Sequence, residues 1–211
     1  MTRRIVSVGL AAGLLCPPFF AGAMVYLTLA QTSFLESSGW SPMRRNKVEW
    51  PSILTLGPKG WYAVATIGAC GVLGGMFAMA LHAIAQTKAL RLTGGLMFLM
   101  ACGVCLVAFR PDPVNTTGPA SWHDTIHNAA YPAIVLLSIG AMCTAWVGAR
   151  TLQRWRVVTY LSIGALAISL PALILAAAEP VAQFARYGFF GPLLVWLEGL
   201  ALTAVSNRPA T

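Results

Sequence analysis

Long runs of hydrophobic residues, separated by short polar segments, dominate this chain. Five runs carry no charged residue, at 5–35, 60–87, 92–109, 125–149 and 157–178, and a sixth, 187–207, is interrupted only by Glu198. An α-helix needs about 20 apolar residues to cross a bilayer. The pattern therefore predicts an all-α, polytopic membrane protein with six transmembrane helices, at about 5–30, 61–85, 92–109, 125–149, 157–178 and 188–206.

Composition agrees with lipid as the main solvent. Of the 211 residues, 57% are hydrophobic and only 9% are charged, against about 25% charged in soluble domains. No low-complexity linker and no internal repeat divides the chain, so we expect one domain over residues 1–211.

The basic residues between the runs predict the orientation. The side that holds both termini carries eight basic residues and no acidic one, whereas the other side carries six basic and five acidic residues. By the positive-inside rule both termini are cytoplasmic, and we expect a multi-pass protein of the bacterial cytoplasmic membrane. The net charge of +8 then indicates anionic lipids as partners, not nucleic acid, and leaves any protein partner unknown.

The N-terminal run has the parts of a signal peptide, with Arg3-Arg4, an apolar stretch and Ala21-Gly22-Ala23. Its apolar character continues through Met24-Val25-Tyr26-Leu27, which favours an uncleaved first helix. Proline lacks an N–H group and obstructs the preceding turn, so Pro17-Pro18 should kink this helix.

The small residues inside the predicted helices indicate packing. All five cysteines, Cys16, Cys70, Cys102, Cys105 and Cys143, fall within the predicted helices, which implies no disulfide framework. The spacing Cys102-x-x-Cys105 admits a redox or metal pair, but small packing thiols are favoured. Gly71 and Gly75 predict a close helix contact.

Most candidate ligand side chains lie between the third and fourth runs, in Arg110-Pro111-Asp112-Pro113 and Ser121-Trp122-His123-Asp124-Thr125-Ile126-His127. Ser121-x-x-Asp124 has the form of a capping box and starts the fourth helix near Trp122. His123 and His127, four residues apart, then share one helix stripe at the outer membrane boundary. The positive end of the helix favours neutral imidazoles.

Neutral imidazole either binds metal or accepts a proton, which gives two chemical hypotheses. With Asp112 as third ligand, the pair could hold one zinc-like divalent ion whose water attacks an ester, amide or phosphoester. The same residues could instead act as an acid–base site or a pH sensor. The pattern lacks the glutamate of zinc proteases, and a structural cluster that ties a loop to the helix is the favoured interpretation.

Two further polar residues lie in or near the predicted spans. His82 is near the cytoplasmic end of the second helix, most of a bilayer from the other histidines, so haem ligation is not expected. Glu198 lies near the midplane, where an ionised carboxylate is costly. With the hydroxyls of Ser138 and Ser169 at that depth, it suits either a proton- or ion-coupled carrier or a neutral acid hydrogen-bonded across helices.

Three blocks of the chain resemble a known family. The segment Trp50-Pro51-Ser52-Ile53-Leu54-Thr55-Leu56-Gly57-Pro58-Lys59-Gly60-Trp61 resembles a Ser-x-Leu-x-Leu-Gly-x-x-Gly-Trp entry to helix two. Phe109-Arg110-Pro111-Asp112-Pro113 resembles a Phe-Pro-x-Asp-Pro block, departing at Arg110, and Trp122-His123-x-x-x-His127 resembles a Trp-His-x-x-x-His helix start. Over about residues 40–205 the chain is similar to the bacterial integral membrane proteins called domain of unknown function 998.

That resemblance implies the six-helix membrane fold and points to Ser52, Asp112, His123 and His127, but implies no activity. The leading hypothesis is a lipid- or envelope-linked site in which Asp112, His123 and His127 bind metal or shuttle protons and Ser52 orients the substrate. The opposing hypotheses are a small carrier that uses Glu198, and a non-enzymatic membrane scaffold or sensor.

Overall fold

The fold is known from a computed structural model that describes residues 2–41, 48–113, 115–176 and 182–207. Of residues 182–186 only the helical backbone is described. Over these ranges there is no strand, and the helices are α1 (Arg3–Ala30), α2 (Thr32–Ser37), η1 (Ser52–Thr55), α3 (Gly60–Ile84), α4 (Lys88–Val107), α5 (Trp122–Ala149), η2 (Gln153–Trp155), α6 (Arg156–Leu175) and α7 (Ala182–Ser206). Six of them are long and apolar enough to cross a membrane, which confirms the predicted all-α membrane fold.

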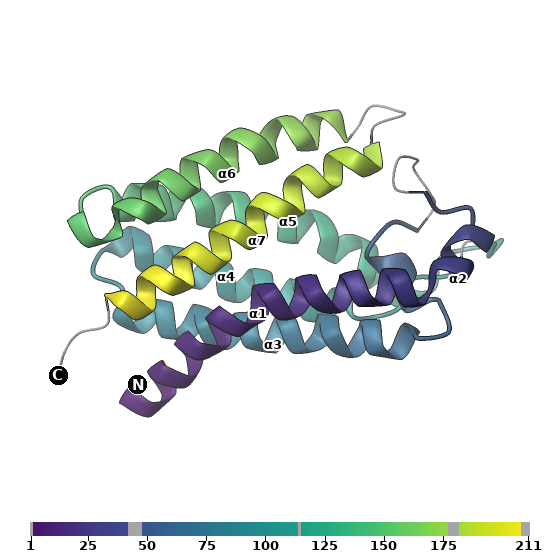
Figure 1. Ribbon diagram of the computed structural model, residues 1–211, viewed down its shortest axis with the longest axis horizontal. Helices are drawn as coiled ribbons and strands as arrows, with labels where there is room; N and C mark the ends of the chain where they lie inside the picture. The colour runs from purple at the N-terminus through teal and green to yellow at the C-terminus, as the bar shows by residue number, and fades with distance from the viewer. Residues whose placement is uncertain (1, 42–47, 114, 177–181, 208–211) are drawn as a thin grey trace.

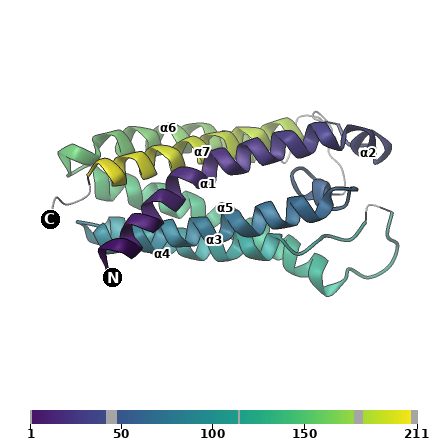
Figure 2. The ribbon, with the colours of Figure 1, turned by 60° about the horizontal axis from the view of Figure 1, so that its bottom comes forward.

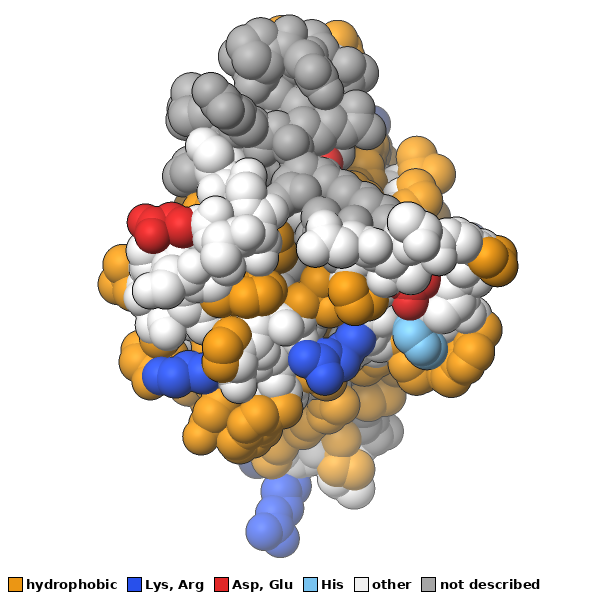
Figure 3. Space-filling view, turned by 90° about the vertical axis from the view of Figure 1, so that its right-hand side faces the viewer, with side chains coloured by type: hydrophobic (Ala, Val, Ile, Leu, Met, Phe, Trp, Pro, Cys, Tyr) orange, Lys and Arg blue, Asp and Glu red, His pale blue; other side chains and the backbone are white. Residues whose placement is uncertain are grey.

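The six long helices form a closed ring in chain order. Each packs against the next one along the chain, and α7 returns to pack against α1. Helix α1 begins and helix α7 ends at one end of the bundle, while α2, η1 and the loop after α4 lie at the other, as Figures 1 and 2 show. We call these the terminal end and the loop end. Figure 3 looks onto the loop end, where side chains of both charges are spread among polar atoms with hydrophobic side chains between them.

Helix α1 bends along its length, as both ribbon views show. Pro17 and Pro18 lie inside it, and each removes a backbone hydrogen bond and pushes the preceding turn away. The predicted kink is therefore present. The terminal-end half of α1 packs closely on α3, where a Cβ added at Gly9 would collide with the Met76 carbonyl and one at Gly13 with the Phe77 ring.

Helices α3 and α4 approach closely where the chain has small residues. A Cβ added at Gly71 would collide with the sulfur of Cys105, and one at Gly75 would lie 3.8 Å from the Cβ of Ala101. Cys102, by contrast, is exposed on the outer surface of the bundle. Cys105 thus serves packing whereas Cys102 does not, and all five cysteines are free thiols inside helices.

Two hydrophobic cores fill the bundle. The larger one lies toward the terminal end and contains Leu81, Leu90, Met142, Trp155 and Trp196, each less than 2% exposed. The smaller one lies toward the loop end and contains Met24, Leu27, Ile53, Leu54 and Ile67. Large side chains such as Leu29, Leu136 and Ile174 are at least 70% exposed on the outside, as suits helices that face lipid.

Candidate functional site

Helix α5 begins at Trp122 because Ser121 caps it. The Ser121 hydroxyl accepts a hydrogen bond from the Asp124 backbone N–H (3.2 Å), which confirms the predicted helix start. A capping box also requires the Asp124 side chain to accept from the Ser121 backbone N–H, and that part of the prediction is wrong. The Ser121 N–H donates to Asp112 Oδ2 (2.8 Å), and Asp124 Oδ1 accepts instead from the Asp112 N–H (3.0 Å). The two carboxylates thus fasten the α4–α5 loop to the start of α5.

His123 belongs to the same network. The Ser121 hydroxyl donates to Asp112 Oδ1 (2.6 Å), since a carboxylate can only accept. His123 Nδ1 must then carry a proton, which it shares between Ser121 Oγ (2.7 Å) and the carbonyl oxygen of Arg110 (3.2 Å). We call Arg110, Asp112, Ser121, His123 and Asp124 the loop clamp, because every one of these contacts joins the loop to α5.

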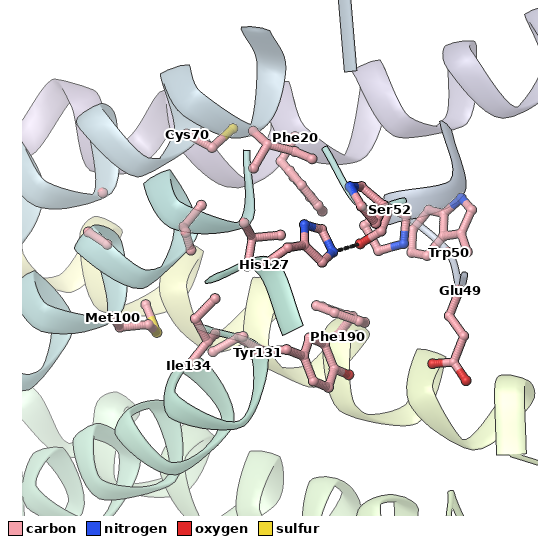
Figure 4. A pocket seen from close by; sticks show the side chains of 18 of the residues that line it. Phe20, Glu49, Trp50, Ser52, Cys70, Met100, His127, Tyr131, Ile134 and Phe190 are labelled. Atoms are coloured by element: carbon pink, nitrogen blue, oxygen red, sulfur yellow. Dashed lines mark hydrogen bonds between the residues drawn. The ribbon is translucent and has the colours of Figure 1, made fainter. Parts of the chain in front are cut away.

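His127, one turn further along α5, points into the bundle and is 5% exposed. Its Nδ1 lies 2.7 Å from the carbonyl oxygen of Phe109, and its Nε2 lies 2.8 Å from Ser52 Oγ. A carbonyl only accepts, so Nδ1 carries a proton, and when the ring is neutral Nε2 accepts the Ser52 hydroxyl. Figure 4 shows this bond inside the cavity. We call it the Ser52–His127 pair.

Helix η1, which carries Ser52, is held from two sides. The Gln31 side chain at the end of α1 donates from Nε2 to the Leu54 carbonyl (3.2 Å) and accepts at Oε1 from the Lys59 N–H (2.9 Å). From the other side, Arg110 donates from Nε to the Thr55 carbonyl (2.8 Å), and its Nη2 donates to the same oxygen. Sequence reasoning missed Gln31, although a lone amide at the end of an apolar run was a signal.

The pair is recessed into the bundle. Ile53 and Leu54 on η1 are fully buried in one cluster with Ala63 and Ile67. The last residue of η1 lies against the start of α3, since a Cβ added at Gly60 would collide with the Thr55 carbonyl. His127 lies in the second turn of α5, as predicted, and its side chain is buried.

A cavity of about 510 Å³ reaches from this pair into the bundle; we call it the central cavity. Toward the loop end its polar lining residues include Ser52, Asp112, Asp124, His127 and Asn128. Its apolar lining includes Phe77, Met97, Met100, Leu193 and Leu197. In Figure 4, Glu49 and Trp50 lie on one side of the pair and Met100 and Cys70 on the other, so the cavity passes the pair rather than ending at it.

The predicted metal ligands do not converge. Within the described ranges, no three His, Cys, Asp or Glu side chains are grouped so as to hold an ion. Both ring nitrogens of His127 already have partners, and the carboxylate of Asp112 faces Ser121. The structure thus brings Ser52 to His127 and Asp112 to His123, in two separate sets. His82 lies near the terminal end of α3, where its Nδ1 is 3.0 Å from the Arg91 carbonyl oxygen.

Glu198 lies on α7 outside the lining of the central cavity. Its Oε2 is buried with no hydrogen-bond partner among the described residues. The predicted serine partners are absent from that atom, since Ser138 donates to the Val135 carbonyl (2.8 Å) and the Ser169 hydroxyl has no described partner.

The relative positions of residues along α6 and α7 explain why Ser169 does not reach Glu198. On α7, Gly199, the neighbour of Glu198, packs against Leu161 of α6. Ser169 lies eight residues further along α6, which is roughly 12 Å at 1.5 Å per residue.

Comparison with known proteins gives one match. A family model described as "Protein of unknown function (DUF998)" matches residues 20–206. No curated protein and no solved structure matches the chain.

Proposed function

The chain belongs to the DUF998 family, and for this family member we propose a function as a membrane-embedded esterase or acyltransferase. Ser52 is the nucleophile and His127 is the general base. The observation that carries the proposal is the 2.8 Å contact between Ser52 Oγ and His127 Nε2 at the wall of a deep cavity. A serine is activated when a neighbouring base accepts its proton and a third group fixes that base.

The third group is the backbone carbonyl of Phe109. It accepts from His127 Nδ1 (2.7 Å) and so fixes the tautomer whose Nε2 faces Ser52, the role that an aspartate fills in serine hydrolase triads. Phe109 follows Ala108, the C-cap residue of α4, and so lies beside the last carbonyls of that helix, which carry partial negative charge. That charge stabilises the imidazolium formed when His127 takes the serine proton.

The reaction has two balanced halves. Ser52 Oγ bonds to the acyl carbon while its proton passes to His127 Nε2, and the leaving alcohol takes that proton as its bond to the acyl carbon breaks. In the second half, His127 accepts a proton from water or from an acceptor alcohol, whose oxygen attacks the acyl-serine. The proton then returns to Ser52 Oγ as the acyl group leaves. In this scheme Asp112 and His123 hold the loop that presents Phe109 and take no part in the bond changes.

Charge distribution supports a location for the site. The terminal end carries Arg3, Arg4, Lys88, Arg91, Arg150 and Arg154 and no acidic residue of the described ranges, which by the positive-inside rule favours a cytoplasmic location. The loop end then faces the outside of a bacterial cytoplasmic membrane. We accordingly assign the substrate to lipids or lipid-linked envelope components.

Ester hydrolysis by the detergent-purified protein tests the proposal, with p-nitrophenyl butyrate as a small probe. Ser52→Ala should lower the rate on the order of 10³-fold or more, and His127→Gln about 10²–10⁴-fold. The matched controls are Ser7→Ala and His82→Gln, which lie far from the cavity and should keep the wild-type rate. A wild-type protein without hydrolysis, or a Ser52→Ala variant with the wild-type rate, would contradict the proposal.

One observation favours a second function, a proton-coupled carrier. The buried Oε2 of Glu198, which has no hydrogen-bond partner in the described part of the chain, is a costly feature inside a membrane, where acidic side chains often mark a proton path. In proteoliposomes loaded with a pH-sensitive dye, Glu198→Gln should then abolish proton uptake under an applied potential, whereas Glu36→Gln on exposed α2 should not. Equal uptake by wild type and Glu198→Gln would rule the carrier out.

A further inference from the structure

The central cavity changes character along its length. At the loop end, its lining residues Gly118, Ala120 and Asn128 are exposed, so the cavity opens there. Next to this mouth lie the Ser52–His127 pair and the carboxylates of the clamp. Further in, the lining is hydrocarbon, aromatic rings and the thiols of Cys16 and Cys70. A ligand that fills it must be polar at one end and apolar over the rest.

The length of the apolar part can be derived from helix register. A Cβ at Gly140 of α5 would lie 3.4 Å from Leu96 of α4, the neighbour of the lining residue Met97. His127 and Gly140 are 13 residues apart on α5, or roughly 20 Å at 1.5 Å per residue. The hydrocarbon core of a bilayer is about 30 Å thick, so one leaflet holds chains of about 15 Å. The cavity is therefore long enough for a lipid acyl chain.

The inner end of the cavity is both closed and adaptable. Leu81, Leu90 and Met142, each below 2% exposed, belong to the core that also contains the lining residues Phe77 and Met97. Met97 and Met100 supply flexible side chains that accommodate ligands of varied shape. At Gly74, a Cβ would make only ordinary contact, since its nearest neighbour would be the Cβ of Ala101 at 3.7 Å.

We infer that the central cavity binds a single long acyl chain, with the chain end at Met97 and the ester carbonyl at Ser52. Its volume of about 510 Å³ falls in the range of about 300–1,000 Å³ found for small-molecule sites. The position of the ester rests on the proposed function, whereas the chain site rests on the cavity alone. The substrate class is thus a long-chain acyl ester of a membrane lipid.

Photocrosslinking tests the chain site without any turnover. The probe is palmitate with a diazirine at its methyl end, added to the detergent-purified Ser52→Ala variant, and the modified residues are mapped by mass spectrometry. Adducts should fall on the inner lining, at Phe77, Met97, Met100 or Leu197. Adducts confined to outward-facing residues such as Leu136 and Val195 would overturn the inference.

Shortening the cavity tests the same site through substrate choice. Gly74→Leu should lower kcat/KM for p-nitrophenyl palmitate about 10-fold or more, while the rate with p-nitrophenyl butyrate stays unchanged. Gly74→Ala fits in ordinary contact and guards against misfolding, and Val72→Leu, on the exposed face of α3, is the matched control. Equal loss with both esters, or none with palmitate, contradicts a chain site.

The two proposals fail in different ways. Inner-lining adducts in a protein that hydrolyses neither ester would leave the acyl-chain site standing and reject the esterase. Hydrolysis of the butyrate ester that depends on Ser52, together with adducts only on the outer surface, would reject the chain site and keep the serine chemistry.

Discussion

His123 and His127 lie on one stripe of α5 and start from the same sequence pattern, yet they are in different situations. The His123 side chain is 41% exposed and binds the loop through Nδ1. His127 is 5% exposed and uses both nitrogens, one on a backbone carbonyl and one on Ser52. The difference comes from what approaches each ring. The loop reaches the first histidine, whereas η1, held by Gln31 and Arg110, reaches the second.

The largest expected difference between the two histidines is in activity. His127→Gln removes the base and should lower ester hydrolysis about 10²–10⁴-fold, while His123→Gln should keep a rate near that of wild type. Rates with p-nitrophenyl butyrate, measured on both variants after equal purification, check this. Equal losses in the two variants would erase the functional distinction between the two positions.

The support of η1 should matter next, because it brings Ser52 to His127. Gln31→Leu leaves the Leu54 carbonyl and the Lys59 N–H without their buried partner and should cost about 1–3 kcal/mol of stability. Hydrolysis should fall as well, since Ser52 loses its position. Thermal melting in detergent measures the loss of stability, with a substitution of the exposed Gln153 on η2, Gln153→Leu, as control. A variant with normal melting and normal rate would show that η1 is held by other contacts.

Loss of the clamp should affect stability more than chemistry. Asp112→Asn puts an amide where Ser121 needs two acceptor oxygens, and about 1–2 kcal/mol of stability should be lost. The fall in melting temperature should exceed any change in hydrolysis, and Glu36→Gln should leave melting unchanged. A complete loss of activity with unchanged melting would instead place Asp112 among the reacting groups.

The smallest expected effect is that of His123 on stability. His123→Ala removes one shared hydrogen bond from a half-exposed ring, a loss of about 0.5–1.5 kcal/mol. Thermal melting compared with Asp112→Asn measures it. If His123→Ala melted well below the Asp112 variant, the histidine, not the carboxylate, would be the centre of the clamp.

Local patterns in the sequence predicted what depends on local forces. The spans follow from apolar length, the start of α5 from Ser121, and the bend of α1 from Pro17-Pro18. The separation of His123 and His127 into two sets of contacts depends instead on contacts between distant segments. The hydrogen bond from Ser52 to His127 joins residues 75 positions apart, and its geometry depends on Gln31, which no motif singled out. The predicted contact between Ser169 and Glu198 is absent for the same reason, because packing sets which residues of α6 and α7 lie side by side.

The most direct measurement of the central claim is the site at which a fluorophosphonate, a reagent for activated serines, modifies the protein. The account predicts one adduct at Ser52 in the wild type, retained in His123→Gln and lost in His127→Gln. Peptide mapping by mass spectrometry distinguishes Ser52 from the other serines. A wild-type protein without an adduct at Ser52, or equal modification of Ser52 in both histidine variants, would contradict it.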